Sequence, residues 1–135
     1  MSECIFCKII AGQIPSFKIY EDDKVLAFLD INPVNPGHTL VVPKNHAADL
    51  IDASEEDVIE LIRAVKKLAP AIIKGAGAEE VNLGVNNGGV AGQVVNHLHF
   101  HIMPRFSGDG HKLWSGKPYG ENEAQQILEK IKKEL

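Results

Sequence analysis

The amino-acid sequence predicts a single α+β domain, residues 1–135, in which helices pack on one antiparallel sheet. A chain of 135 residues suits one hydrophobic core rather than two. Hydrophobic residues make up 44% of the sequence, enough to form that core without disulfide bonds. Helical and strand-like stretches follow one another without strict βαβ alternation. About five antiparallel strands are therefore expected, rather than a doubly wound parallel sheet.

The first third of the chain predicts a short helix, a hairpin and one further strand. Residues 4–12 place apolar side chains at helical spacing and end at a glycine. Residues 18–20 and 25–29 are rich in β-branched and aromatic side chains on either side of an acidic turn, which is typical of a hairpin. Two prolines and a glycine make residues 32–37 a loop, and residues 39–42 form a short β run.

A long amphipathic helix comes next. Ser54 resembles an N-cap followed by three acidic residues, and the apolar face continues until Gly75. Pro70 lies inside this pattern and is expected to kink the helix, because it lacks an N–H and crowds the preceding turn. Residues 81–85 and 94–104 are predicted strands, joined by a glycine-rich loop.

The last part of the chain is predicted to be irregular over residues 105–120 and helical over residues 121–135. No apolar run is long enough to span a bilayer and no signal peptide is visible, so a cytoplasmic protein is expected. The formal charge of −4 argues against a nucleic-acid polymer as the main partner. The two cysteines are too close in sequence for a disulfide to staple a secreted scaffold.

Histidine is the unusual residue type, because three of the six lie within five positions. Alternate side chains of a strand share a face, so His97, His99 and His101 are expected to point the same way while Leu98 and Phe100 face the core. A purely structural role explains three imidazoles at this spacing poorly. They favour either three ligands of one catalytic metal or a nucleophile whose neighbours act as an acid and bind phosphate.

The loop just before the histidines helps to decide between these two. Residues 86–93 combine exposed backbone N–H groups with amide side chains, which suits an anion. The loop lacks the Gly-Lys-Ser/Thr ending of a Walker motif. Its position indicates a phosphate held against an imidazole.

At this point a family resemblance becomes plain. Residues 92–103, which read GQVVNHLHFHIM, resemble the histidine-triad (HIT) motif, and further matching segments lie at residues 4–7, 28–33, 36–38 and 41–46. The chain is similar to prokaryotic HIT proteins near the Hint branch. The resemblance implies a HIT-like fold with a long central helix and helices at both ends. It also implies a homodimer, which we expect to form through residues 55–74 and an edge strand.

The family's activity implies an enzyme that cleaves at the α-phosphorus of a small purine nucleotide of the AMP or GMP type. The substrate classes are a nucleoside phosphoramidate, an aminoacyl adenylate or a dinucleoside polyphosphate. By resemblance His99 is the nucleophile and forms a nucleotidyl-histidine intermediate, and His101 contacts the phosphate or leaving group. His97 and Gln93 complete the implied catalytic set, and no catalytic metal is required.

The resemblance also implies the nucleotide contacts. Asp30 is expected to accept the ribose hydroxyls, and Asn86 and Gln93 to hold phosphate oxygens. The remaining expected contacts are His38 near the reacting centre, a base wall of Ile5, Phe6, Ile9, Phe28 and Ile31, and Trp114 reaching the site of a partner subunit. Val94 departs from the pattern, because related branches often carry Ser or Thr there, and this puts a specific phosphoramidase activity in doubt.

A structural zinc site is the second implication. Some HIT branches bind zinc through a set that matches Cys4, Cys7, His46 and His97 here, and Cys-x₂-Cys is a typical zinc-ligand spacing. Such a zinc ion would tie the N-terminal helix to the catalytic strand. A redox pair and a coincidental spacing are the alternatives for the two cysteines.

Two rival functions remain open on sequence grounds. One is a metallohydrolase with His97, His99 and His101 on one catalytic zinc ion. The other is a nucleotide-binding regulatory protein whose slow turnover is incidental.

Overall fold

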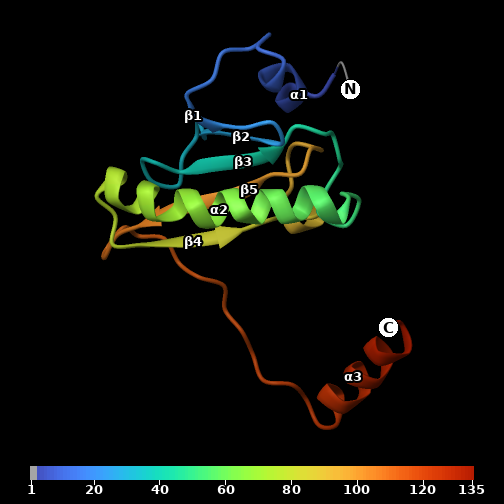
Figure 1. Ribbon diagram of the computed structural model, residues 1–135. Helices are drawn as coiled ribbons and strands as arrows, with labels where there is room; N and C mark the ends of the chain where they lie inside the picture. The colour runs from blue at the N-terminus through green and yellow to red at the C-terminus, as the bar shows by residue number, and fades with distance from the viewer. Residues whose placement is uncertain (1–2) are drawn as a thin grey trace.

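The computed structural model describes residues 3–135 and confirms the α+β architecture, with a five-stranded antiparallel sheet of order β1-β2-β3-β5-β4 (Figure 1). The strands are β1 (Lys18–Glu21), β2 (Val25–Leu29), β3 (Thr39–Pro43), β4 (Glu80–Gly84) and β5 (Phe100–Arg105). The helices are α1 (Ile5–Ile10), α2 (Glu55–Ala76) and α3 (Glu123–Lys133), with a short 3-10 turn, η1, at Gly89–Ala91. No helix in the described part of the chain is long and apolar enough to cross a membrane.

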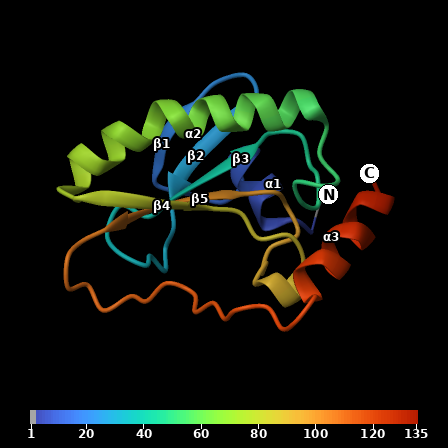
Figure 2. The ribbon, with the colours of Figure 1, turned by 90° about the horizontal axis from the view of Figure 1, so that it is seen from below.

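Helix α2 covers one face of the sheet (Figure 2). Ser54 caps its first turn by accepting a hydrogen bond from the Asp57 N–H, and Gly77 ends it with a left-handed backbone conformation. The helix runs unbroken through Pro70. Its apolar stripe is buried against the sheet in a core that includes Val25, Ala27, Val41, Leu61, Val65, Leu68, Ile72, Leu98 and Ile102.

Helix α1 lies on the opposite face. Phe6 is buried there with Leu26 and Phe28 of β2 and Leu40 and Val42 of β3. Successive residues of β2 and β3 therefore point to α2 and α1 in turn, which explains why both strands are almost continuously apolar. Helices cover both faces of the sheet, where the sequence suggested one.

The predicted strand 94–104 is too long at its start, because β5 begins only at Phe100. Pro43, at the end of β3, has no N–H with which to extend the ladder. Its carbonyl instead accepts a hydrogen bond from His97 Nε2, at 2.8 Å, and the Leu98 N–H bonds to the Ala47 carbonyl. His97 and His99 therefore precede β5, and only His101 belongs to it. The prediction that the three histidines lie on one face of one strand is wrong.

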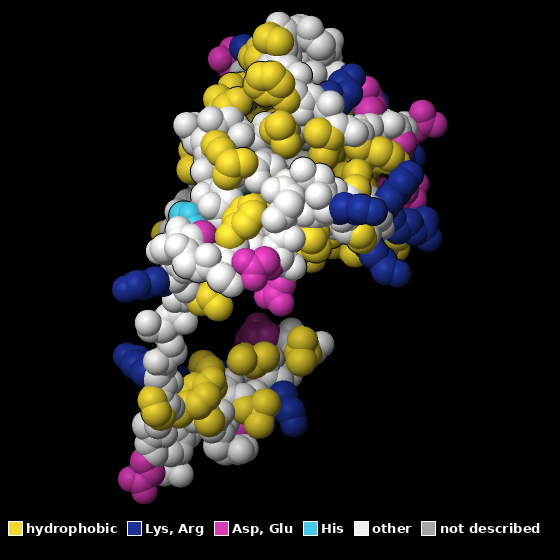
Figure 3. Space-filling view, turned by 90° about the vertical axis from the view of Figure 1, so that its left-hand side faces the viewer, with side chains coloured by type: hydrophobic (Ala, Val, Ile, Leu, Met, Phe, Trp, Pro, Cys, Tyr) yellow, Lys and Arg dark blue, Asp and Glu magenta, His cyan; other side chains and the backbone are white. Residues whose placement is uncertain are grey.

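Residues beyond Arg105 form an arm that leads away from the sheet (Figures 1 and 3). It carries apolar side chains that stay exposed in the single chain: Ile127, Leu128 and Ile131 on its helix α3, and Leu135 beyond that helix. Strand β4 is an edge of the sheet, and its Leu83 is half exposed. A second copy of the chain would be able to cover both apolar surfaces. The homodimer stays a prediction.

Candidate functional site

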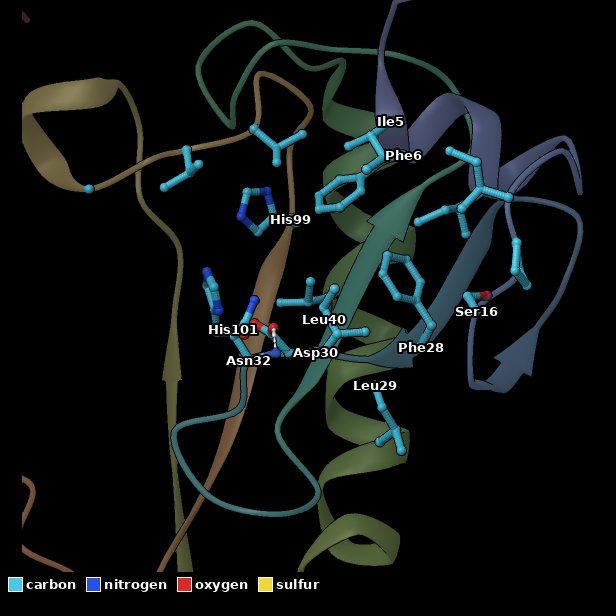
Figure 4. A pocket seen from close by; sticks show the side chains of 17 residues that line it. Ile5, Phe6, Ser16, Phe28, Leu29, Asp30, Asn32, Leu40, His99 and His101 are labelled. Atoms are coloured by element: carbon cyan, nitrogen blue, oxygen red, sulfur yellow. Dashed lines mark hydrogen bonds between the residues drawn. The ribbon is translucent and has the colours of Figure 1, made fainter.

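A cavity of about 420 Å³ lies between α1, β2 and the histidine segment (Figure 4). A pocket of this size, mainly apolar with a few polar groups, is typical of small-molecule sites. It brings together many residues that the sequence singled out: Ile5, Phe6, Ile9, Phe28, Asp30, Ile31, His99 and His101. Figure 4 shows Phe6 and Phe28 on one side of the space, with Asp30 and His101 close together at one end.

His99 is positioned by its own backbone neighbourhood. Its Nδ1 lies 2.7 Å from the His97 carbonyl, which can only accept, so Nδ1 carries the proton and Nε2 keeps a lone pair. Phe6 packs edge-on against the ring at a centroid distance of 5.1 Å. An imidazole held in one orientation, with Nδ1 committed to a carbonyl, is suited to act as a nucleophile through Nε2.

The tautomer of His101 follows from its contact with His38. The Val34 N–H donates to His38 Nδ1 at 3.0 Å, so His38 carries its proton on Nε2. That proton is donated to His101 Nδ1 at 2.9 Å. His101 must then hold its own proton on Nε2, which makes it a hydrogen-bond donor on its other side.

Both of these imidazoles are favoured in the neutral form. Burial, followed by the neighbouring His99 and His38, lowers the pKa of His101 to about 4. Burial also lowers the pKa of His38, against the opposing effect of the Asp30 carboxylate. His101 is therefore an uncharged N–H donor near neutral pH.

This depressed pKa makes the fold sensitive to acid. The unfolded chain takes up the His101 proton near pH ~6.5, before the folded chain does, so unfolding becomes easier as pH falls below that value. We expect a loss of about 1 to 2 kcal/mol in the free energy of unfolding between about pH 7 and about pH 5. His101→Asn keeps an oxygen that can accept from His38 but does not titrate, so it should lose less. Urea denaturation at both pH values measures the difference, and equal losses in the two proteins would contradict the assignment.

Four side chains outside the pocket form a cluster with the geometry of a tetrahedral metal site. His97 Nδ1 lies 3.4 Å from Cys4 Sγ, 3.6 Å from Cys7 Sγ and 3.2 Å from His46 Nδ1. Ligand atoms around one tetrahedral zinc ion are about 3.3 to 3.8 Å apart. Because His97 donates from Nε2 to the Pro43 carbonyl, its Nδ1 lone pair faces the two thiols. The donor set therefore fits zinc.

A second cluster, Asp30, His38 and His101, has ligand atoms within 4.8 Å of one another but does not fit a metal. The Val34 N–H occupies His38 Nδ1, so His38 Nε2 carries a proton and offers no lone pair. His38 instead donates a hydrogen bond to His101 at the end of the pocket, and the Asp30 carboxylate lies 3.7 Å from His38 Nε2.

The loop before the histidines is braced by its own side chains. Gln93 is buried, its amide nitrogen donates to the carbonyls of Ala48 and Val95, and its oxygen accepts from the Gly88 N–H. Asn86 packs beside Gly92, which lines the pocket. The amide of Gln93 is thus occupied by backbone groups, and the phosphate contacts expected of Gln93 and Asn86 stay predictions.

Some predicted residues lie away from the cavity and some of its lining was not foreseen. Trp114 is exposed on the arm. His38 does not line the cavity but donates a hydrogen bond to His101, which does. The lining that sequence reasoning missed is Ile14, Pro15, Ser16, Leu29, Asn32, Leu40 and Val95, whereas Gly92 and Val94 line the pocket next to the expected phosphate loop. Leu40 could have been found from strand register, since it pairs with His101.

The chain is similar to known proteins along most of its length. The model of the HIT domain family matches residues 11–108. The adenosine 5'-monophosphoramidase hnt1 of Schizosaccharomyces pombe is 41% identical over 135 residues, covering 98% of both chains.

Solved structures share the fold. The structure of SMU.412c from Streptococcus mutans matches with a TM-score of 0.94 and 41% identity, covering 99% of this chain and 86% of that one. A Zn-bound histidine triad family protein from Mycobacterium smegmatis matches with a TM-score of 0.78 and 35% identity, covering 99% of both.

Proposed function

Because the chain belongs to the HIT domain family, we propose that it is a nucleotide hydrolase or nucleotidyltransferase that acts at the α-phosphorus of a small nucleotide. The observation that carries the proposal is the fixed tautomer of His99, whose Nε2 lone pair stands in the wall of an apolar pocket. The relative from S. pombe named as a monophosphoramidase supports the reaction class. A nucleoside phosphoramidate, an aminoacyl adenylate and a dinucleoside polyphosphate are the candidate substrates.

The base and ribose have clear places in this proposal. The purine lies between the apolar side chains of α1 and β2, where stacking on Phe6 and Phe28 is available. The Asp30 carboxylate at the end of the pocket accepts the ribose hydroxyls. This arrangement leaves the α-phosphate beside His99 and His101.

The reaction then runs in two displacements. His99 Nε2 forms a bond to phosphorus while the bond to the leaving group breaks, and the leaving group departs with the electron pair and takes up a proton. His101 donates a hydrogen bond from Nε2 to the leaving atom or a phosphate oxygen. Water next attacks phosphorus, its released proton balances the one taken up earlier, and the electron pair of the N–P bond returns to His99.

Asp30 provides a test of the nucleotide orientation. Asp30→Asn keeps an oxygen to accept from the Asn32 N–H, as Asp30 Oδ1 does at 2.8 Å, but loses the carboxylate. We expect AMP affinity to fall roughly tenfold, because hydrogen bonds to charged groups contribute about 1.5 to 3 kcal/mol. The affinity of 2',3'-dideoxy-AMP should change little. Isothermal titration calorimetry compares the two ligands, with exposed Asp23→Asn as control, and an equal loss for both ligands would refute the ribose contact.

We propose that Cys4, Cys7, His46 and His97 hold a structural zinc ion. When bound, the ion would cross-link α1, the segment after β3 and the histidine segment. The Zn-bound relative from M. smegmatis supports this assignment. Reaction chemistry is not assigned to the ion, so chelation that leaves the fold intact should leave kcat, measured at saturating substrate, intact.

We also propose a homodimer that uses α2 and the β4 edge, with Trp114 of one copy meeting the site of the other. The exposed Trp114, at 91%, and the uncovered apolar side of α3 support it.

A further inference from the structure

Asp109 is the centre of a polar network at the start of the arm. Its side chain is only 7% exposed and forms a two-bond ion pair with Arg105, at 2.8 and 3.0 Å. The carboxylate also accepts from the backbone N–H groups of Phe106 and His111 and from the side chain of Asn35. The Arg105 pair and these N–H groups hold the pKa of Asp109 well below its usual range. A nearly buried carboxylate with this many donors is a rigid support.

The network reaches the loop of residues 32–37 at two points. Asn35 donates to Asp109 and to the Pro104 carbonyl, at 3.0 and 2.8 Å. His111 Nε2 donates to the Val34 carbonyl at 2.8 Å. Gly37 fixes the far end, because its positive φ and close approach to α2 leave no room for a side chain.

This loop lies at the polar end of the pocket, where Figure 4 shows Asp30, Asn32 and His101 together. Its Val34 N–H determines the tautomer of His38, because this N–H donates to His38 Nδ1, which must therefore be the unprotonated nitrogen. His38 decides the tautomer of His101 in the same way. The loop conformation is therefore linked to the position of a proton in the pocket.

We propose that Asp109 is a positioning residue for the nucleotide site. By fixing residues 32–37, it makes the Val34 N–H select the Nε2–H form of His38. His101 is then left with an N–H to present to the substrate. The inference about catalysis rests on the proposed function, whereas the inference about the tautomers does not.

The tautomers can be read directly from nitrogen-15 NMR of the imidazole rings in the ligand-free protein. In the wild type, His38 and His101 should both be Nε2–H forms. Asp109→Ala should give a mixture of the two neutral forms at both rings, which a merely structural loss of stability would not produce. If the variant keeps the wild-type tautomers, the proposal is wrong.

Kinetics give the second readout. Asp109→Ala should lower kcat and kcat/KM equally, by about fivefold to tenfold, the effect of one hydrogen bond that matters only in the transition state. Glu79→Ala is the matched control, because Glu79 holds Ser107 of the same turn and does not touch residues 32–37. It should leave both the tautomers and kcat unchanged, and a change equal to that of Asp109→Ala would overturn the proposal.

A milder variant keeps the test decisive if Asp109→Ala does not fold. His111→Ala removes an exposed side chain and its bond to Val34, and it should lower kcat about twofold to threefold with the same tautomer mixing. His111→Gln retains an N–H donor and should restore both. Wild-type tautomers in His111→Ala would count against the proposal. Absence of turnover in the wild type would refute the proposed function instead and would leave the tautomer result standing.

Discussion

His99→Ala should lower turnover of an adenosine phosphoramidate by about 10⁴-fold or more, because it removes the atom that forms the covalent bond. His99 is 7% exposed, and its Nδ1 is already committed to the His97 carbonyl, so the loss is specific to the Nε2 lone pair. Binding of AMP should be affected far less, since the ring is only part of the pocket wall. Steady-state kinetics and calorimetry on the same preparation separate the two effects.

Asn96→Ala is a suitable control for this variant. Asn96 is exposed on the same segment, and its replacement should leave turnover close to wild type. Near wild-type turnover in His99→Ala would show that the covalent mechanism is wrong. A protein that binds AMP tightly but turns over no substrate in either form would favour the regulatory function.

Cys4→Ser and His46→Ala should each reduce zinc from about one ion per chain to nearly none, because a closed tetrahedral site needs all four ligands. Cys4 caps α1 and the pocket residues Ile5 and Phe6 follow it directly, so loss of zinc should loosen that wall. AMP affinity should fall, and hydrogen exchange of α1 should become faster. Elemental analysis, calorimetry and hydrogen exchange provide three independent readouts.

The same measurement separates the structural site from a catalytic one. His99→Ala should keep its zinc, because His99 is not among the four clustered residues. Loss of zinc in His99→Ala with retention in Cys4→Ser would favour a metallohydrolase built on the three histidines.

Local patterns were sufficient for much of the fold. The apolar period after Ser54 predicted α2 correctly, and the acidic turn predicted the β1–β2 hairpin. The family pattern singled out His99, His101 and Asp30, and all three line one cavity. These features depend on neighbours in sequence or on a shared motif, so no knowledge of the tertiary structure was needed.

Other features depend on contacts between distant residues and could not be predicted. The late start of β5 depends on the Pro43 carbonyl meeting the His97 ring, 54 residues away in sequence. The pairing of Asn35 with Asp109 spans 74 residues and lies in a stretch that looked irregular. The burial of the Gln93 amide depends on Ala48, which belongs to another loop. In each case a polar group is satisfied by a partner that only the folded chain brings near.

Intact-mass spectrometry of the protein quenched during turnover tests the central claim most directly. A panel of adenosine and guanosine phosphoramidates, aminoacyl adenylates and dinucleoside polyphosphates would also identify the preferred base and leaving group. We predict a mass increase of one nucleoside monophosphate less water, located on His99 by peptide fragmentation and absent from His99→Ala. Steady turnover with no adduct, or an adduct on another residue, would contradict the proposed mechanism.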